Sequence, residues 1–254
     1  MNPSNKLAIV TGGNSGLGEA TTKALMAAGA RVVTFDVSGE APAGAISIPC
    51  DVSDPAAVKQ AVAQVAQDHG PIAILANCAG IGGIGGIANA DGPGDLEAFR
   101  RVVDVNLMGA VNVTAEVAHR MIGNDPEGDD AERGVIINAC SIASFEGQEG
   151  MGAYTASKSA LAGLTLVWAR DLSRHHIRAA GIAPGFFDTP LVAGLPEEMV
   201  EELLADSEFP KRAGRSEEYA EAALFVIRNP MFNGDVMRLD AGTRPPARTR
   251  WTAN

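Results

Sequence analysis

The chain has 254 residues, of which 46% are hydrophobic and 20% charged, and its formal net charge is -11. This length and apolar content suit one large α/β domain with a substantial core and argue against disorder. The acidic balance argues against a nucleic-acid-binding face and against attachment to an anionic membrane surface. Small anionic ligands stay possible, because they need only a local basic patch.

Strand-like and helix-like segments alternate along the whole chain. Short apolar runs predict seven strands, at residues 7–10, 31–36, 45–49, 72–76, 135–139, 177–183 and 236–239. The segments between them predict helices at 16–28, 55–69, 96–123 (two pieces that meet near Asn106), 153–175 and 216–228, the last capped by Ser216. Apolar strands that alternate with helices indicate a parallel sheet covered on both faces. We expect one domain, residues 1–254.

Three stretches interrupt the alternation. Residues 80–94 are rich in glycine and predict an irregular loop, and residues 124–133 predict an acidic surface loop. Residues from about 184 to 210 separate the sixth strand from the next helix. Long insertions beyond strand ends often carry ligands, so this segment is the expected substrate loop. Its residues 196–204 have apolar side chains at helical spacing, which fits either a wall for an acyl chain or ordinary core packing.

The cysteines and the first residues of the chain indicate whether a metal site, a secretory leader or a membrane span is expected. Cys50, Cys78 and Cys140 are far apart, and each ends or follows an apolar run, as buried cysteines do. No CxxC motif or Cys/His cluster predicts a metal site. The chain enters a strand almost at once and has no run of ~18 apolar residues. We therefore expect no secretory leader, no membrane span and a cytoplasmic protein.

A glycine-rich turn, TGGNSGLG at residues 11–18, follows the first strand. Gly12, Gly16 and Gly18 allow a tight turn and a close approach to a pyrophosphate, which the next helix N-terminus would attract. Asp36 ends the second strand, where an acid can accept hydrogen bonds from both ribose hydroxyls of an adenosine. An acid there would repel a 2′-phosphate, and no lysine or arginine directly follows it. The sequence therefore predicts NAD rather than NADP.

Three side chains predict proton transfer at an alcohol or ketone oxygen. Tyr154 and Lys158 are four residues apart in YTASK, so a helix would place them on one face. A lysine cation beside a phenol favours the phenolate form, and such a phenol can give or take a proton. Ser141 follows the apolar strand at 135–139 and can hydrogen-bond the same substrate oxygen.

Taken together, these motifs resemble the short-chain dehydrogenase/reductase family over nearly the whole chain. The matching features are TGGNSGLG, Asp51-Val52, Asn77-Cys78-Ala79-Gly80, Asn106, Ser141, YTASK and Pro184-Gly185. NLMGAVNV, GVIINACSIASFEGQEG, IAPGFFDTPLVAGLPEE, FPKRAGRSEEYA and NPMFNGDVMRLDAGTR are similar to type 2 3-hydroxyacyl-CoA dehydrogenases within that family. One departure is Cys78, which stands where the family usually has a second asparagine.

The resemblance implies a single-domain Rossmann fold with a doubly wound, parallel, seven-stranded sheet, an NAD cofactor and a homotetramer. It implies that Ser141, Tyr154 and Lys158 are catalytic, that Ser141 and Tyr154 bind substrate, and that Asn106 continues a proton path from Lys158 through water. The residues implied at the cofactor are Gly12, Ser15, Gly16, Leu17, Gly18, Asp36, Asp51, Val52, Asn77, Cys78, Ala79, Gly80, Tyr154, Lys158, Pro184, Gly185, Phe187 and Thr189.

The expected activity is interconversion of a secondary alcohol and a ketone with NAD, most specifically of 3-hydroxyacyl-CoA and 3-oxoacyl-CoA in fatty acid metabolism. A hydroxysteroid or another secondary alcohol fits the same type of pocket. A 3-oxoacyl-carrier-protein reductase using NADPH is a further alternative, against which Asp36 and the acidic balance weigh. An NAD-binding regulator and a purely structural assembly role are non-enzymatic alternatives. The intact set of Ser141, Tyr154 and Lys158 disfavours the regulator, whereas an assembly role, for which helices 96–123 and 153–175 offer small, apolar faces, does not exclude catalysis.

Overall fold

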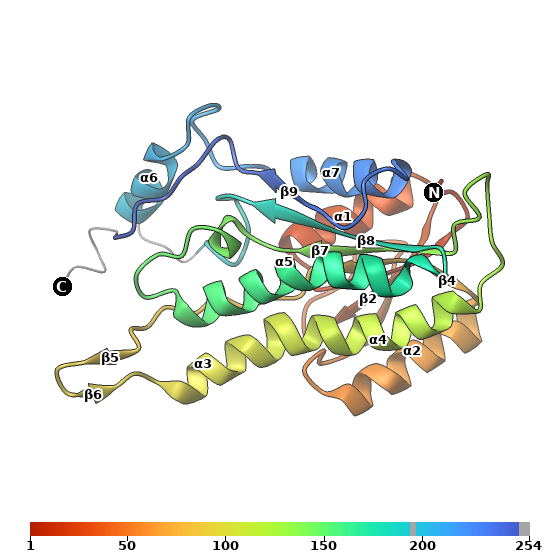
Figure 1. Ribbon diagram of the computed structural model, residues 1–254, viewed down its shortest axis with the longest axis horizontal. Coiled ribbons are helices and arrows are strands. Elements are labelled where there is room, and N and C mark those ends of the chain that lie inside the picture. Colours follow the sequence, from red (N-terminus) through yellow and green to blue (C-terminus); the bar gives the residue numbers. More distant parts are fainter. Residues whose placement is uncertain (194–196, 249–254) are drawn as a thin grey trace.

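The computed structural model describes residues 1–193 and 197–248. A seven-stranded sheet forms its centre, in the order β3-β2-β1-β4-β7-β8-β9, with every neighbouring pair parallel (Figure 1). The strands are β1 (Leu7–Thr11), β2 (Arg31–Asp36), β3 (Ile46–Pro49), β4 (Ile72–Asn77), β7 (Gly134–Ala139), β8 (Ile177–Pro184) and β9 (Val236–Leu239). The winding direction changes between β1 and β4, so a ligand crevice is expected at their carboxyl ends. The predicted doubly wound parallel sheet is confirmed.

Helices cover both faces of the sheet, as Figure 1 shows. On one face lie α1 (Gly16–Ala27) and α7 (Ser216–Arg228), which pack against each other. On the other lie α2 (Pro55–His69), α4 (Gly109–Ile122) and α5 (Gly152–Ser173). α3 (Leu96–Val103) continues into α4, and α6 (Glu197–Ala205) lies in the long segment between β8 and α7.

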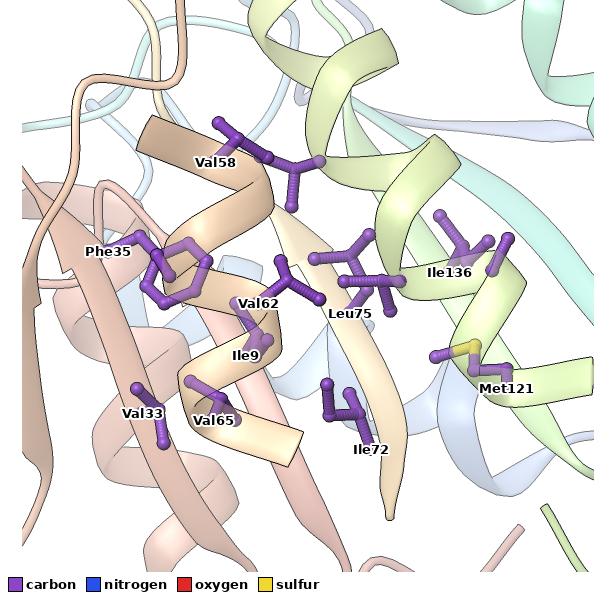
Figure 2. Packing of buried hydrophobic residues seen from close by; sticks show 14 of the residues in the cluster. Ile9, Val33, Phe35, Val58, Val62, Val65, Ile72, Leu75, Met121 and Ile136 are labelled. Atoms are coloured by element: carbon purple, nitrogen blue, oxygen red, sulfur yellow. The ribbon is translucent and has the colours of Figure 1, made fainter. Parts of the chain in front are cut away.

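Alternate residues of each strand supply the two halves of the core. In β1, Ile9 joins the cluster beneath α2 and α4, while Val10 joins the cluster beneath α1 and α7. Figure 2 shows the first cluster, where Val62 of α2 lies near Phe35 of β2 and Met121 of α4 lies near Ile136 of β7. Because both faces are covered, both sets of side chains must be apolar, which explains the continuous apolar runs in the sequence.

Two expected features differ in the structure. α7 begins at Ser216, but Ser216 does not cap it: the Glu218 carboxylate accepts from the backbone N–H of Arg215 over 2.8 Å, and the Ser216 hydroxyl donates to the carbonyl of Asp188 over 3.3 Å. The expected irregular loop at residues 80–94 contains a small hairpin of β5 (Ala88–Asn89) and β6 (Gly92–Pro93). The Asn89 side chain stabilises its turn by accepting from the N–H of Asp91 over 2.9 Å.

The helical segment after that hairpin is continuous. Asp104–Met108 forms a π-helical turn between α3 and α4, and Asn106 lies within it. The two predicted pieces therefore do meet at Asn106, through an irregular turn of the kind often found at functional sites. In the expected substrate loop, residue 196 lies outside the described residues, and α6 occupies the helical stretch predicted from 196 to 204.

Candidate active site

The glycine turn after β1 is shaped by close backbone contacts. Gly12 has a φ of +63°, and a Cβ there would lie 2.9 Å from the Cα of Ala79. A Cβ at Gly18 would lie 2.0 Å from the carbonyl oxygen of Gly12, so no other residue fits. The Thr11 hydroxyl accepts from the N–H groups of Cys78 over 3.1 Å and Ala79 over 3.0 Å. The ends of β1 and β4 are thereby joined beneath the N-terminus of α1.

Asp36 is held in one orientation by backbone donors. One carboxylate oxygen accepts from the N–H of Val37 over 2.9 Å and of Ser38 over 3.3 Å, and the other accepts from the N–H of Asn14 over 3.2 Å. A carboxylate has about four acceptor positions, and the backbone fills three of them, so the oxygen that accepts only from Asn14 can still accept from a ligand hydroxyl.

A cleft of about 950 Å³ opens over this end of the sheet. Most of the predicted cofactor residues line it: Gly12, Ser15, Gly16, Leu17, Gly18, Asp36, Asp51, Val52, Cys78, Ala79, Gly80 and Thr189. The rest of the wall comes from α3, the π-helical turn and the start of the expected substrate loop, including Arg101, Val105 and Leu191. This volume lies within the range of ~300–1,000 Å³ typical of small-molecule sites.

Four of the predicted cofactor residues are placed behind the cleft. The Asn77 amide donates to Thr114 Oγ1 over 2.9 Å, inside the protein. Phe187 is buried, with its ring beneath Gly214, where a Cβ would lie 2.6 Å from it. Pro184 ends β8, and Gly185 donates its N–H to the carbonyl of Leu239 over 2.9 Å. These four residues shape the edge of the sheet without lining the cleft.

Tyr154 and Lys158 lie one turn apart near the start of α5. The Lys158 Nζ is 5.8 Å from the centroid of the Tyr154 ring. Lys158 is only 5% exposed, and its Nζ donates to the carbonyl of Ala139 over 2.6 Å. This bond anchors α5 to the end of β7, two residues before Ser141.

Ser141 is fixed by a short 3-10 turn, residues Ile142–Ser144, that follows β7. Its hydroxyl accepts from the N–H of Ala143 over 3.1 Å. The Ser144 hydroxyl accepts from the N–H of Ser141 over 3.3 Å and donates to the carbonyl of Lys158 over 2.9 Å. Ser144, which sequence reasoning missed, therefore sets the position of Ser141 relative to the helix that carries Tyr154.

Asn106 holds the loop after β4. Its side chain accepts from the N–H of Ile81 over 2.8 Å and donates to the carbonyl of the same residue over 2.9 Å. It also donates to the Ser157 hydroxyl over 3.3 Å, and that hydroxyl donates to the carbonyl of Tyr154 over 2.7 Å. The π-helical turn is thereby connected to the first turns of α5.

Gly80 is where the cleft meets the residues predicted to be catalytic. It lines the cleft, and a Cβ on it would lie 3.3 Å from Asn106 Oδ1 and 3.5 Å from Lys158 Nζ. Ser141, Tyr154, Lys158 and Asn106 do not themselves line the cleft, but Lys158 and Asn106 lie directly next to Gly80, which does. The structure thus brings together the two groups of residues that the sequence singled out separately.

β9 and the segment that follows it bond to the loop between Ser141 and Tyr154, a connection that sequence reasoning missed. Arg238 donates to Glu146 over 2.7 Å, and this bond raises the pKa of the Arg238 guanidinium. Glu149 donates its N–H to the carbonyl of Ala247 over 2.9 Å. Glu208, near the end of the expected substrate loop, donates its N–H to the carbonyl of Ala241 over 2.9 Å. One segment therefore holds both loops.

The environment of the three cysteines favours the protonated, unreactive form of their thiols. Burial raises the pKa of the thiols of Cys50, Cys78 and Cys140 to about 11. Among residues 1–193 and 197–248, no group of three or more His, Cys, Asp or Glu side chains is arranged to hold a metal ion. Within the same residues, every helix is too short or too polar to cross a membrane.

The chain is similar to known proteins over nearly its full length. A family model described as short chain dehydrogenase matches residues 6–200. The human protein named 3-hydroxyacyl-CoA dehydrogenase type-2 is 43% identical over 94% of this chain and 95% of its own length. A Thermotoga maritima protein named 3-oxoacyl-[acyl-carrier-protein] reductase is 32% identical over 95% of this chain and 99% of its own. The crystal structure of a Mycobacterium avium 3-hydroxyacyl-CoA dehydrogenase type-2 superimposes with a TM-score of 0.88 at 35% identity, covering 97% of this chain and 99% of that one.

Proposed function

Since the chain belongs to the short-chain dehydrogenase family, and is therefore an oxidoreductase that acts on secondary alcohols, we propose that its cofactor is NAD and its substrates are 3-hydroxyacyl-CoA and 3-oxoacyl-CoA thioesters. The observation that carries the cofactor choice is Asp36, oriented in the cleft by three backbone N–H groups. The substrate choice is supported by the human and mycobacterial relatives, whose names specify this thioester.

The cleft fits a nicotinamide dinucleotide. The glycine turn, whose shape Gly12 and Gly18 make possible, lines the cleft together with the first residues of α1, where a pyrophosphate could accept from backbone N–H groups. Asp36 would bind the adenosine ribose, while Asp51 and Val52 would border the adenine. When bound, NAD+ supplies the acceptor for the hydride that leaves the alcohol carbon.

Proton transfer would be the work of α5 and the end of β7. Tyr154 would take the hydroxyl proton of the substrate, and the nearby Lys158 cation would stabilise the negative charge on the phenol oxygen in the proton-free state. Ser141 would hydrogen-bond the substrate oxygen and fix its orientation. Lys158 would also bind the nicotinamide ribose. Asn106, in the π-helical turn, would continue a proton path that leads from Lys158 through water.

We further propose a role for the substrate loop and a homotetrameric assembly. Residues from about 184 to 210 would close over the substrate, with Leu191 already on the wall of the cleft. A homotetramer follows from the family resemblance, and α5 offers small residues (Ala160, Ala162 and Gly163) for close packing between subunits. The single domain of residues 1–254, the homotetramer and the cytoplasmic location stay predictions.

The test is a steady-state comparison of substrates and cofactors. Purified enzyme would be assayed with 3-hydroxyacyl-CoA thioesters of increasing length, with hydroxysteroids and with simple secondary alcohols, each with NAD+ and with NADP+. We expect the highest kcat/KM for a CoA thioester with NAD+. A higher value for a steroid would refute the substrate, and a preference for NADPH in the ketone-reducing direction would favour a 3-oxoacyl-carrier-protein reductase.

A further inference from the structure

We propose that Arg100 and Arg101 of α3 form a phosphate-binding site in the wall of the cleft, for the pyrophosphate of a nucleotide ligand. Both arginines line the cleft, and both are exposed. The glycine turn and Asp36 line the same cleft. Because guanidinium groups present a planar set of donors that matches phosphate oxygens, they suit this ligand better than lysines would.

The charge distribution in the cleft favours such a site. Five acidic side chains line it: Asp36, Asp51, Asp95, Glu97 and Asp104. Among the described residues, the two arginines are the only basic side chains in the lining. The glycine turn, residues 11–18, contains no lysine or arginine. The N-terminus of α1 contributes only ~0.5 of a positive charge. A pyrophosphate with two negative charges would meet a predominantly acidic surface without these arginines.

Neither arginine is used in holding the protein together. Glu97 and Asp104 are three or four residues from Arg100 and Arg101, which is the spacing at which helical ion pairs form. Even so, within residues 1–193 and 197–248, no hydrogen bond or ion pair engages either guanidinium. By contrast, Lys23 on α1 pairs with Glu19 at the same spacing. The two guanidinium groups of α3 are therefore available to a ligand.

The π-helical turn explains why α3 presents these residues to the cleft. Val105, inside that turn, lines the cleft, and Arg101 lies one helical turn before it on the same side. Asn106, also in the turn, is tied to Ile81 by two hydrogen bonds, so the orientation of the helix is fixed. The arginines are thus carried on a rigid element facing the ligand space.

Two ligands carry the required chemistry. One is the dinucleotide itself. The other is the nucleotide part of a CoA thioester, and this second possibility rests on the substrate proposed above. Both contain a nucleoside diphosphate, and the experiment below separates them.

The first arm measures binding of NADH by fluorescence titration at low salt. The proteins are the wild type, Arg100→Gln, Arg101→Gln and the double variant. Arg120→Gln is the matched control, because Arg120 is an exposed arginine on α4 outside the cleft lining. If the site holds the dinucleotide, the double variant should bind NADH about tenfold more weakly, as two partly exposed charge pairs imply. The difference should shrink at high salt, and the control should not change.

The second arm compares 3-hydroxybutyryl-CoA with its N-acetylcysteamine thioester, which has no nucleotide. If the site holds the CoA arm, the double variant should raise the KM for the CoA thioester about tenfold and leave the KM for the short thioester unchanged. An unchanged NADH Kd together with an unchanged KM for the CoA thioester would overturn the proposal. If the wild type turns over neither thioester, the proposed substrate is wrong and the NADH titration alone decides about the arginines.

Discussion

Asn77 and Asn138 lie opposite each other on β4 and β7, and the Nδ2 of Asn77 donates to the Oδ1 of Asn138 over 3.0 Å. Asn138 in turn donates to Thr165 of α5 over 3.1 Å, and Asn77 donates to Thr114 of α4. This buried bridge ties the two central strands to the two helices above them. It also fixes the end of β7 from which Ser141 projects.

Replacing Asn138 with leucine should therefore destabilise the protein. The change removes one of the two hydrogen bonds that the buried Asn77 amide donates and the bond that the Thr165 hydroxyl accepts, while Asn77 still donates to Thr114 and Thr165 to the carbonyl of Leu161. Each lost hydrogen bond costs about 0.5–1.5 kcal/mol. We expect the free energy of unfolding, measured in urea, to fall by about 1–3 kcal/mol. Thr165→Val removes only the outer link and should cost less. Equal stability of Asn138→Leu and the wild type would show that the bridge is unimportant.

Tyr154→Phe should lower kcat by a factor of about 10²–10⁴, the usual contribution of a positioned proton donor or acceptor. The Kd for NADH should stay within about twofold, since only a hydroxyl is removed. The chain has just one other tyrosine, Tyr219, which is fully buried in α7. Tyr219→Phe is the matched control and should keep near-normal kcat. Near-normal turnover by Tyr154→Phe would contradict the assigned role.

Asp36→Asn should weaken discrimination against NADP. The asparagine keeps the shape of the side chain and loses the charge that would repel a 2′-phosphate. At ~5 Å and an effective dielectric constant of ~20, that repulsion is about 3 kcal/mol, so the ratio of kcat/KM for NAD to NADP should fall on the order of 100-fold. Asp51→Asn, a change to another carboxylate that lines the cleft, should leave the ratio unchanged. A ratio that does not move with Asp36→Asn would exclude charge repulsion as the source of the preference.

The buried thiols predict a loss of stability in alkali. In the folded protein the pKa of each of the three thiols is raised from 9.0 to about 11. A raised pKa contributes stability that is fully present below pH 9 and is lost as the pH rises toward 11. The free energy of unfolding should therefore decline across that window, and less steeply in a variant with Cys50, Cys78 and Cys140 changed to alanine. Parallel declines in the two proteins would contradict this account.

Those thiols should also resist alkylation in the native state. At pH 8 they are protonated, and the thiolate is the reactive form. Iodoacetamide should label the native protein far more slowly than the urea-unfolded one. Rapid labelling of native Cys78, which lines the cleft, would show that its thiol ionises more readily than its surroundings imply.

Features with a local signature could be predicted from the sequence. The strands were recognisable because both of their faces are buried, so that Ile9 and Val10 are both apolar. Asp36 was informative because its distance from the glycine turn is fixed by one helix and one strand. The pairing of Tyr154 with Lys158 required only that α5 be helical. In each case, one element or two consecutive elements set the spacing.

Features that depend on distant contacts could not be predicted in this way. The bond between Arg238 and Glu146 joins residues 92 positions apart, and nothing near either residue indicates it. Ser216 has the residue type of a helix cap, but Glu218 reaches back to Arg215 and takes that role. A signal did exist for Asn138: a polar residue inside an otherwise apolar strand must find a partner in the core.

Because of the π-helical turn at Asp104–Met108, the direction in which the side chains of α3 point depends on the number of residues in that turn. Each residue of a regular helix advances the direction of its side chains by ~100°. Deleting one residue there would restore a regular helix and swing everything before it through about a quarter turn, carrying Arg100 and Arg101 away from the opening. A single lost codon, with every side chain of the sheet intact, would then alter ligand recognition more than most substitutions.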